Sequence, residues 1–141
     1  MFIDGFKVVW ESKAQGNIFL KIIWALRLVG GSRSSEGRVG VFHNNAWETV
    51  CDDWWGINDA HVVWNQLGYP GSIRAPRHAR FGVGRGQICL DDVKCQGNEP
   101  SIVYCRHNWW GIHNCGHHSD ASVVCYGGKS DYTFYQEPTI P

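Results

Sequence analysis

The residues best suited to chemistry follow the first cysteine of the chain. Cys51 is followed directly by Asp52 and Asp53, and a second carboxylate pair, Asp91 and Asp92, ends a later apolar segment. Adjacent carboxylates repel each other unless a cation or an arginine neutralises them, and a crosslink through the cysteine would hold them in place. Carboxylate oxygens are ligands that calcium and magnesium prefer. The alternative is that these aspartates cap turns and pair with nearby arginines.

A second group of candidate residues lies in a glycine- and proline-rich segment, residues 69–86. It concentrates arginines, of which Arg74, Arg77 and Arg80 are the candidates for ligand binding. A guanidinium group matches sulfate, phosphate or carboxylate in bidentate geometry, so several on one loop predict salt-sensitive binding of anionic ligands. The alternative is an ordinary solvated loop.

Soft metal ligands also crowd the later part of the chain, and they make a zinc module a competing hypothesis. They are Cys105, His107, His113, Cys115, His117 and His118. Their spacing fits no C-x-x-C pairing, and zinc binding would leave Cys51 and Cys95 without a role. No hydrolase, zinc-protease or phosphate-loop motif occurs, so the sequence does not predict an enzyme.

Composition limits the class of protein further. The chain has 141 residues, 43% of them hydrophobic, which suffices for the core of one domain with extensions. Its formal net charge is zero, which argues against specific recognition of nucleic acid, because such proteins need an excess of Lys and Arg. Six cysteines, 17 glycines and 8 tryptophans predict a loop-rich fold with a disulfide framework, formed in an oxidising compartment.

The elements that must position these residues follow from hydrophobic periodicity. Residues 37–55 alternate on both sides of the turn signal Asn44-Asn45-Ala46 and predict a β-hairpin that ends at the first acidic pair. A helix is expected from a cap at Asn58 or Asp59 through Leu67, with Gly68 as its stop. Its single apolar face must lie on a sheet. Further strands are predicted at residues 24–29, 87–93 and 121–125.

The two ends of the chain carry less information. The apolar run of residues 18–29 is interrupted by Lys21 and Arg27 and is too short to span a bilayer, so no membrane insertion is expected. A signal peptide is the alternative for this run, but its second half is better explained as the first strand. We therefore divide the chain into an extension, residues 1–23, a domain, residues 24–126, and a tail or linker, residues 127–141.

A series of segments in this order resembles a known family. They are LRLVGG, EGRVGVFHNNAWETVCDDWWG, VVWNQLGYPG, RFGVGRGQICLDDVKCQGNEPSIVYC and WWGIHNCGHHSDASVVC. From about Leu26 to Tyr126 the chain resembles a scavenger receptor cysteine-rich (SRCR) domain, of the six-cysteine group found at the ends of macrophage scavenger receptors. The resemblance implies an α+β fold, in which a curved antiparallel sheet cradles one helix and disulfides staple the domain.

The resemblance also implies disulfides, and here the chain departs from the family. Cys51 is expected to pair with Cys115, and Cys95 with Cys105. The third family bridge uses a helix cysteine, but this chain has Trp64 there and has Cys89 where the family usually carries tryptophan. We expect Cys89 to pair with Cys125, while Trp64 fills the vacated core volume. The alternative is two buried free thiols.

The resemblance further implies ligand binding assisted by a divalent cation, Ca²⁺ or Mg²⁺. Its ligands are expected to be Asp52, Asp53 and Asp92, with Asp91 as a further candidate. The implied function is an extracellular, non-catalytic module, secreted or in a membrane-protein ectodomain, that recognises polyanionic or protein ligands within a multidomain or oligomeric protein. The alternative is an accessory domain of a larger protein, such as one carrying a protease or oxidase.

The tryptophans divide into two expected groups. Trp47, Trp55 and Trp110 match core or near-core positions of the family, so packing is their expected role. Trp54 and Trp109 are the additional members of two Trp-Trp pairs. We expect them either to form an exposed aromatic patch or to lie in a second buried layer.

Overall fold

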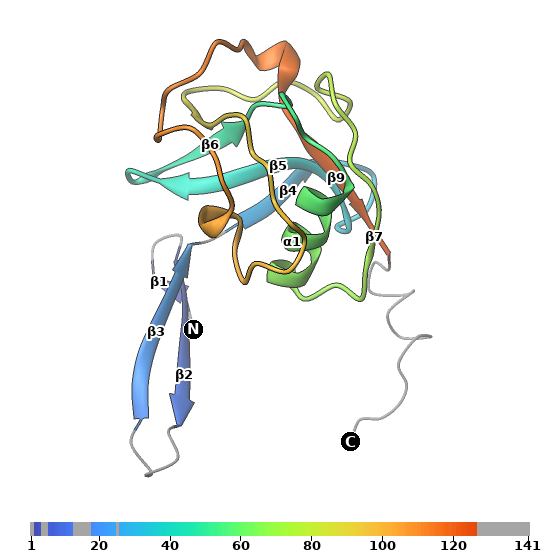
Figure 1. The fold of residues 1–141 in the computed structure, drawn as a ribbon. Helices are drawn as coiled ribbons and strands as arrows, with labels where there is room; N and C mark the ends of the chain where they lie inside the picture. The colour runs from blue at the N-terminus through green and yellow to red at the C-terminus, as the bar shows by residue number, and fades with distance from the viewer. Residues whose placement is uncertain (1, 4–5, 13–17, 25, 127–141) are drawn as a thin grey trace.

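The structure is a computed structural model that describes residues 2–3, 6–12, 18–24 and 26–126 (Figure 1). Its described elements are β1 (Phe2–Ile3), β2 (Phe6–Ser12), β3 (Ile18–Trp24), β4 (Leu26–Gly30), β5 (Glu36–His43), β6 (Ala46–Val50), α1 (Ile57–Leu67), β7 (Ser72–Arg74), β8 (Ile88–Leu90), the 3₁₀-helices η1 (Ile102–Tyr104) and η2 (His117–Ser119), and β9 (Ser122–Cys125). The predicted tail, residues 127–141, lies outside the described residues. None of the described helices is long and apolar enough to cross a lipid bilayer.

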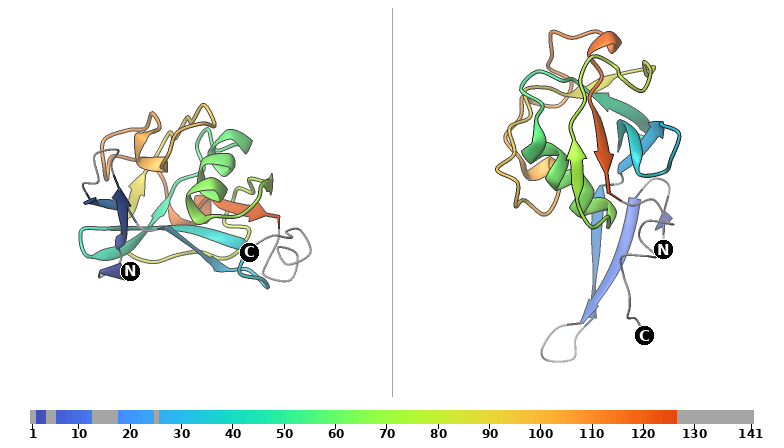
Figure 2. Two further views of the ribbon diagram at one scale, coloured as in Figure 1. Left: turned by 90° about the horizontal axis from the view of Figure 1, so that it is seen from below. Right: turned by 90° about the vertical axis from the view of Figure 1, so that its right-hand side faces the viewer.

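The main sheet is built around β5. Along its path the strand order is β7-β9-β5-β6-β8, and β4 pairs with the other edge of β5. The first residues of β5 pair with β9, whereas its last residues pair with β6. All pairs are antiparallel except β6 with β8, which is parallel because α1 and a long loop form the connection between those two strands. The predicted α+β fold, with a curved sheet around one helix, is confirmed (Figure 2).

The predicted hairpin forms as its sequence indicates. β5 and β6 pair from Gly40 with Thr49 to His43 with Ala46. Asn44 and Asn45 both have positive φ, 50° and 65°, which is the backbone of a tight hairpin turn that asparagine tolerates. The alternation places Val39, Val41 and Val50 in the core. The hairpin therefore determines which side chains are buried and where the first acidic pair lies.

Helix α1 begins slightly earlier than predicted, because Gly56 rather than Asn58 or Asp59 is the N-cap. Asp59 instead accepts a hydrogen bond from the backbone N–H of Gly56, at 2.8 Å, and a second from that of Cys95, also at 2.8 Å. Gly68 ends the helix in the left-handed conformation, as predicted. The helix packs against β4, β7 and β9 and buries Ala60, Val62 and Val63.

The N-terminal residues form a separate sheet in the order β1-β2-β3. Strands β2 and β3 pair from Phe6 with Trp24 to Ser12 with Ile18, and they extend away from the main sheet (Figures 1 and 2). Strands β1 and β2 lie in the N-terminal extension, where the sequence predicts no strand. The apolar run of residues 18–29 contributes β3 and most of β4.

Two of the three expected disulfides form. Cys51 is bonded to Cys115 and Cys95 to Cys105. The prediction of a Cys89–Cys125 disulfide was wrong, because both residues are free, buried thiols, as in the alternative. Cys89 lies on β8 and Cys125 on β9, and β5 and β6 separate these strands in the sheet. Three strand spacings amount to about 14 Å along the sheet, beyond the roughly 7 Å limit between bridged Cα atoms. Half-buried Trp64 packs against the core that contains Cys89.

Asp59 should be a stability determinant. Replacing it with alanine leaves the buried N–H of Cys95 without its acceptor and removes the bond to Gly56 at the helix start. We expect Asp59→Ala to lower the free energy of unfolding by about 2 to 4 kcal/mol in urea denaturation. The control is Asn58→Ala, an exposed position in the same turn, which should change it by less than about 0.5 kcal/mol. Equal losses in the two variants would contradict this role of Asp59.

The two free thiols should be unreactive until the chain unfolds. Burial raises the pKa of Cys125 to about 12, and burial together with the charge of Glu48 raises the pKa of Cys89 further. At pH 8 we expect no reaction of the folded chain with Ellman's reagent, and two thiols per chain in guanidinium chloride without reductant. Cys89→Ala should reduce that number to one. A tryptic peptide joining Cys89 to Cys125 would overturn the assignment.

Candidate functional site

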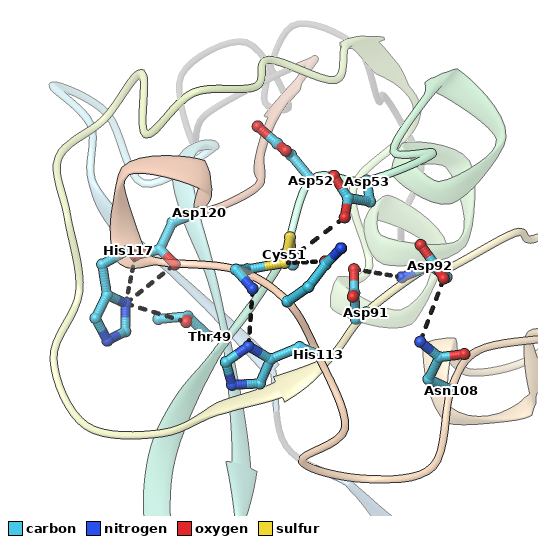
Figure 3. Close-up of a disulfide and its surroundings, with 12 residues drawn as sticks. Thr49, Cys51, Asp52, Asp53, Asp91, Asp92, Asn108, His113, His117 and Asp120 are labelled. Carbon is cyan, nitrogen blue, oxygen red and sulfur yellow. Dashed lines mark hydrogen bonds and ion pairs between the residues drawn. A yellow bond between two sulfur atoms is a disulfide. The ribbon is translucent and has the colours of Figure 1, made fainter.

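An acidic cluster lies beside the Cys51–Cys115 disulfide (Figure 3). A carboxylate oxygen of Asp53, one of Asp91 and the two bridged sulfur atoms all lie within 4.8 Å of one another. Asp53 follows β6 and Asp91 follows β8, so the parallel pairing of these strands brings the two side chains to the same edge of the sheet. The bridge attaches the loop before η2 to this edge.

The backbone around the cluster is held by hydrogen bonds from three segments. The N–H of Cys51 donates to the carbonyl of Leu90, and the N–H of Asp52 donates to the carbonyl of Ser119. The carbonyl of Asp91 accepts a bond from the N–H of Asn108. The positions of the carboxylates therefore depend on loops that lie far apart in the sequence.

The predicted metal ligands do not all meet. Asp52 is buried and its side chain turns away from Asp53, accepting a hydrogen bond from the N–H of His78 at 2.7 Å (Figure 3). Asp92 has a φ of 54° and accepts a bond from the Asn108 side chain at 3.2 Å. Asp53 instead lies close to Asp91, the further candidate, and not to the predicted ligand Asp92.

Asp91 is the carboxylate of this cluster whose pKa is raised. Burial raises the pKa of its carboxyl, the N–H of Asp92 partly offsets this by donating to it at 2.7 Å, and the charges of Asp92 and Asp53 raise it further. A bound cation would relieve this repulsion.

The donor set fits a hard divalent cation and not zinc. Carboxylate oxygens suit Ca²⁺ or Mg²⁺, whereas the sulfur atoms of Cys51 and Cys115 are bonded to each other and are not thiolate ligands. Two carboxylates supply only part of the six to eight oxygen atoms that calcium takes. Water or the oxygen atoms of an acidic ligand would have to complete such a site.

The zinc hypothesis from the histidine-rich segment was wrong. Cys105 and Cys115 are both consumed by disulfides. His117 contacts the buried carboxylate of Asp120 at 3.0 Å through Nδ1, and the carbonyl of Gly86 at 2.9 Å through Nε2. These contacts hold the loop around Gly86 to the rest of the domain.

The three predicted arginines differ in their surroundings. Arg77 donates two hydrogen bonds to the carbonyl of Trp55, at 3.0 and 2.7 Å, and so supports the backbone next to the acidic pair. Arg74 lies on β7 and Arg80 lies in the following loop, and both are exposed. The role of these arginines in ligand binding stays a prediction.

The tryptophans separate into packed and exposed groups. Trp55 is buried, and Trp47 and Trp110 are half-buried, as the sequence predicts for packing residues. Trp110 stacks on His43 with ring centroids 4.1 Å apart. Trp54 and Trp109 are 65% and 82% exposed, and the ammonium of Lys94 lies 4.4 Å from the Trp54 ring.

Sequence reasoning missed one further group of charged residues. Arg27, Arg38 and Arg85 line a hollow of about 280 Å³ on the main sheet. They come from three separate segments, and no short motif contains them. The sequence indicates the position of one of them, because side chains alternate along a strand and Arg38 therefore lies on the opposite face from the core residues Val39 and Val41.

Comparison with known proteins gives a consistent result. Residues 29–126 match the scavenger receptor cysteine-rich domain family. Galectin-3-binding protein of Rattus norvegicus is 49% identical over 100 residues, which cover 71% of this chain and 17% of that protein. A scavenger receptor cysteine-rich domain superfamily protein of Patiria pectinifera is 53% identical over 100 residues, covering 71% of this chain and 9% of that protein. The chain thus spans less than a fifth of the length of these curated relatives.

Two solved structures share the fold. The third SRCR domain of murine neurotrypsin has a TM-score of 0.68 and 48% sequence identity, and the match covers 73% of this chain and 96% of that one. The dimeric form of the SRCR domain of mouse MARCO has a TM-score of 0.60 and 46% identity, covering 70% and 92% of the two chains.

The raised pKa of Asp91 predicts a pH effect on stability. Because the folded state binds the proton more tightly than the unfolded state, this carboxyl favours folding below its unfolded pKa of about 4. That contribution is lost as the pH rises through the folded pKa. We expect the free energy of unfolding of the metal-free chain to fall, relative to that of Asp91→Asn, as the pH rises from the unfolded pKa of Asp91 to its folded pKa. A difference in the free energy of unfolding between the two chains that stays constant from pH 3 to pH 7 would contradict a raised pKa of Asp91.

Proposed function

Because the chain belongs to the scavenger receptor cysteine-rich domain family, we propose that it is a non-catalytic recognition module that binds anionic or protein ligands with help from a divalent cation. Domains of this family are extracellular modules of larger proteins that mediate protein interactions. The disulfides Cys51–Cys115 and Cys95–Cys105 fit that oxidising environment.

The observation that carries the proposal is the meeting of Asp53 and Asp91 beside a disulfide. Burial, and after it the charges of Asp92 and Asp53, raise the pKa of Asp91, and calcium or magnesium held there would favour its charged form. The ion would keep open coordination positions, which sulfate, phosphate or carboxylate groups of a ligand would fill. Asp53 and Asp91 would hold such an ion, and it would then join the acidic cluster to an acidic ligand.

The cluster is buried on the side of Asp91, which is 2% exposed, and opens to solvent on the side of Asp53. Asp53 is half-buried, and the exposed Trp54 follows it directly in the sequence. Two carboxylates and an incomplete set of donors favour weak affinity, in the range of extracellular calcium modules, from about 0.1 to 1 mM. Several copies in one parent protein would convert such weak sites into tight binding.

A second candidate is a metal-independent protein interface, as in an accessory domain of a larger protein. Exposed apolar side chains favour it, since Tyr104, Trp109 and Ile112 are 70%, 82% and 62% exposed. Aromatic side chains are enriched at the centres of protein interfaces. A hollow of about 300 Å³, lined by Val103, His107, Asn108, Trp109 and Trp110, lies in this region.

Calcium titration of the oxidised chain by calorimetry tests the proposed cation site. We expect saturable binding in the intact chain and at least about tenfold weaker binding in Asp53→Asn/Asp91→Asn, because both carboxylates are lost. Calcium should also raise the retention of the intact chain on immobilised dextran sulfate.

The matched control is Glu36→Gln/Glu99→Gln, which removes the same charge from acidic residues other than Asp53 and Asp91; Glu99 lies beside the Cys95–Cys105 disulfide and accepts hydrogen bonds from the N–H groups of Gln96 and Gly97. Its calcium affinity should stay within about twofold of the intact chain. If both double variants lose calcium equally, general electrostatics and not a site explains the binding. If immobilised dextran sulfate retains the intact chain equally with calcium and with a chelator, the cation has no role in ligand capture.

A further inference from the structure

The N-terminal strands β2 and β3 form a ribbon with one apolar face. They pair antiparallel, from Phe6 with Trp24 to Ser12 with Ile18. Because successive residues of a strand lie on opposite faces, residues that pair directly across the two strands share a face. The register therefore assigns to one face of the ribbon Phe6, Val8, Trp10, Leu20, Ile22 and Trp24.

The opposite face of the ribbon has a different composition. Along it, each charged residue pairs with an apolar one, as Lys7 does with Ile23 and Val9 with Lys21. Glu11 and Phe19 form the last such pair. Charges spread along a strand face are typical of the side of an antiparallel sheet that contacts water. The first face is therefore the one that a partner has to cover.

The ribbon stands apart from the rest of the domain. In Figures 1 and 2, most of the length of β2 and β3 lies clear of the other described elements. A single residue separates β3 from β4, which leaves the ribbon little freedom to fold back over its own domain. A two-stranded hairpin is marginally stable by itself in water. Cover for the apolar face is thus expected from another molecule.

The size of the apolar face fits an interface with a second copy of this chain. Aromatic side chains bury about 150 to 250 Å² each, so Phe6, Trp10 and Trp24 supply at least about 450 Å² per copy. With the three aliphatic residues of the face, two copies exceed the roughly 1,000 Å² at which specific protein interfaces begin. Two such faces are also identical in shape and composition, as a two-fold symmetric interface requires.

The charge on β3 favours packing between faces over pairing between strand edges. In the order β1-β2-β3, strand β3 forms an edge of the described sheet. Lys21 lies at the middle of β3, and antiparallel pairing of two copies of β3 about their midpoints would place it opposite its own copy. Like charges directly opposite each other are destabilising, and lysine is a common protection of sheet edges. Face-to-face packing avoids this contact.

We propose that the apolar face of β2 and β3 is a homodimerisation surface, on which the same face of a second copy packs about a two-fold axis. The two ribbons then form the layers of a small sandwich, about 10 Å apart. The surface lies outside residues 29–126, which match the domain family, so it is an addition that this chain carries. A dimer holds two acidic clusters, and ligands with repeated groups would engage both.

Sedimentation velocity of the intact, oxidised chain tests the proposal. We expect a reversible equilibrium between monomer and dimer over about a hundredfold range of concentration, with a chelator present throughout. The chelator makes the result independent of the proposed cation site, so the two proposals fail separately. A chain that stays monomeric over this range would overturn the dimer and leave the cation site untouched.

A pair of double variants tests which face forms the interface. Val8→Thr/Ile22→Thr changes two directly paired residues of the apolar face, and threonine keeps their preference for a strand. The dimer dissociation constant should rise by about a hundredfold or more, because a two-fold interface contains each substitution twice. Val9→Thr/Ile23→Thr makes the same changes one position along, on the other face, and should stay within about threefold. Equal effects of the two variants would overturn the assignment.

Hydrogen exchange provides a measurement that needs no variant. The amides of residues 6–12 and 18–24 should exchange more slowly at concentrations where the dimer predominates than where the monomer does. Exchange that is independent of concentration, in a sample that does dimerise, would place the interface elsewhere on the molecule. Thermal unfolding of both double variants shows whether the domain itself remains folded.

Two other occupants of the apolar face would give different results, and each would overturn the dimer. If residues 127–141 cover the face, the intact chain is monomeric, and their removal accelerates exchange in residues 6–12 and 18–24. If a lipid surface covers it, the monomer binds phosphatidylcholine vesicles, and Val8→Thr/Ile22→Thr weakens that binding while the chain shows no dimer in solution.

Discussion

The disulfide between Cys51 and Cys115 is the constraint on which the functional end of this domain depends. It closes a loop of 64 residues. By the loop-entropy relation this lowers the conformational entropy of the unfolded chain and stabilises the folded state by about 4 kcal/mol. It also attaches an irregular C-terminal segment to the end of β6, where Asp53 lies. Backbone hydrogen bonds support the same attachment, from the N–H of Asp52 to the carbonyl of Ser119 and from the N–H of Ala121 to the carbonyl of Val50.

The domain keeps its opposite charges on different parts of one sheet. Acidic residues gather at the end of β6 and β8, whereas Arg27, Arg38 and Arg85 gather over the outward face of β4, β5 and β6. This separation is compatible with a net charge of zero, since local fields act within about a Debye length. A near-neutral chain thus carries an acidic cluster and a basic hollow at separate places on one domain.

The core shows how the fold tolerates the loss of one bridge. Cys89 and Cys125 are buried among apolar residues on β8 and β9, and Trp64 packs at the margin of the same cluster. Buried thiols behave as small hydrophobic side chains. Packing of α1 against β9 and the disulfides Cys51–Cys115 and Cys95–Cys105 hold the core together without a third crosslink.

The sequence by itself determined the hairpin and the end of the helix at Gly68, because each depends on local periodicity or on a residue's own conformational preference. Resemblance to a family added the overall fold and two disulfides. Only the tertiary structure decided that Asp53 meets Asp91 while Asp52 turns to His78, and that three distant arginines share a hollow. These arrangements depend on contacts between segments far apart in the chain, and no local pattern of residues specifies them.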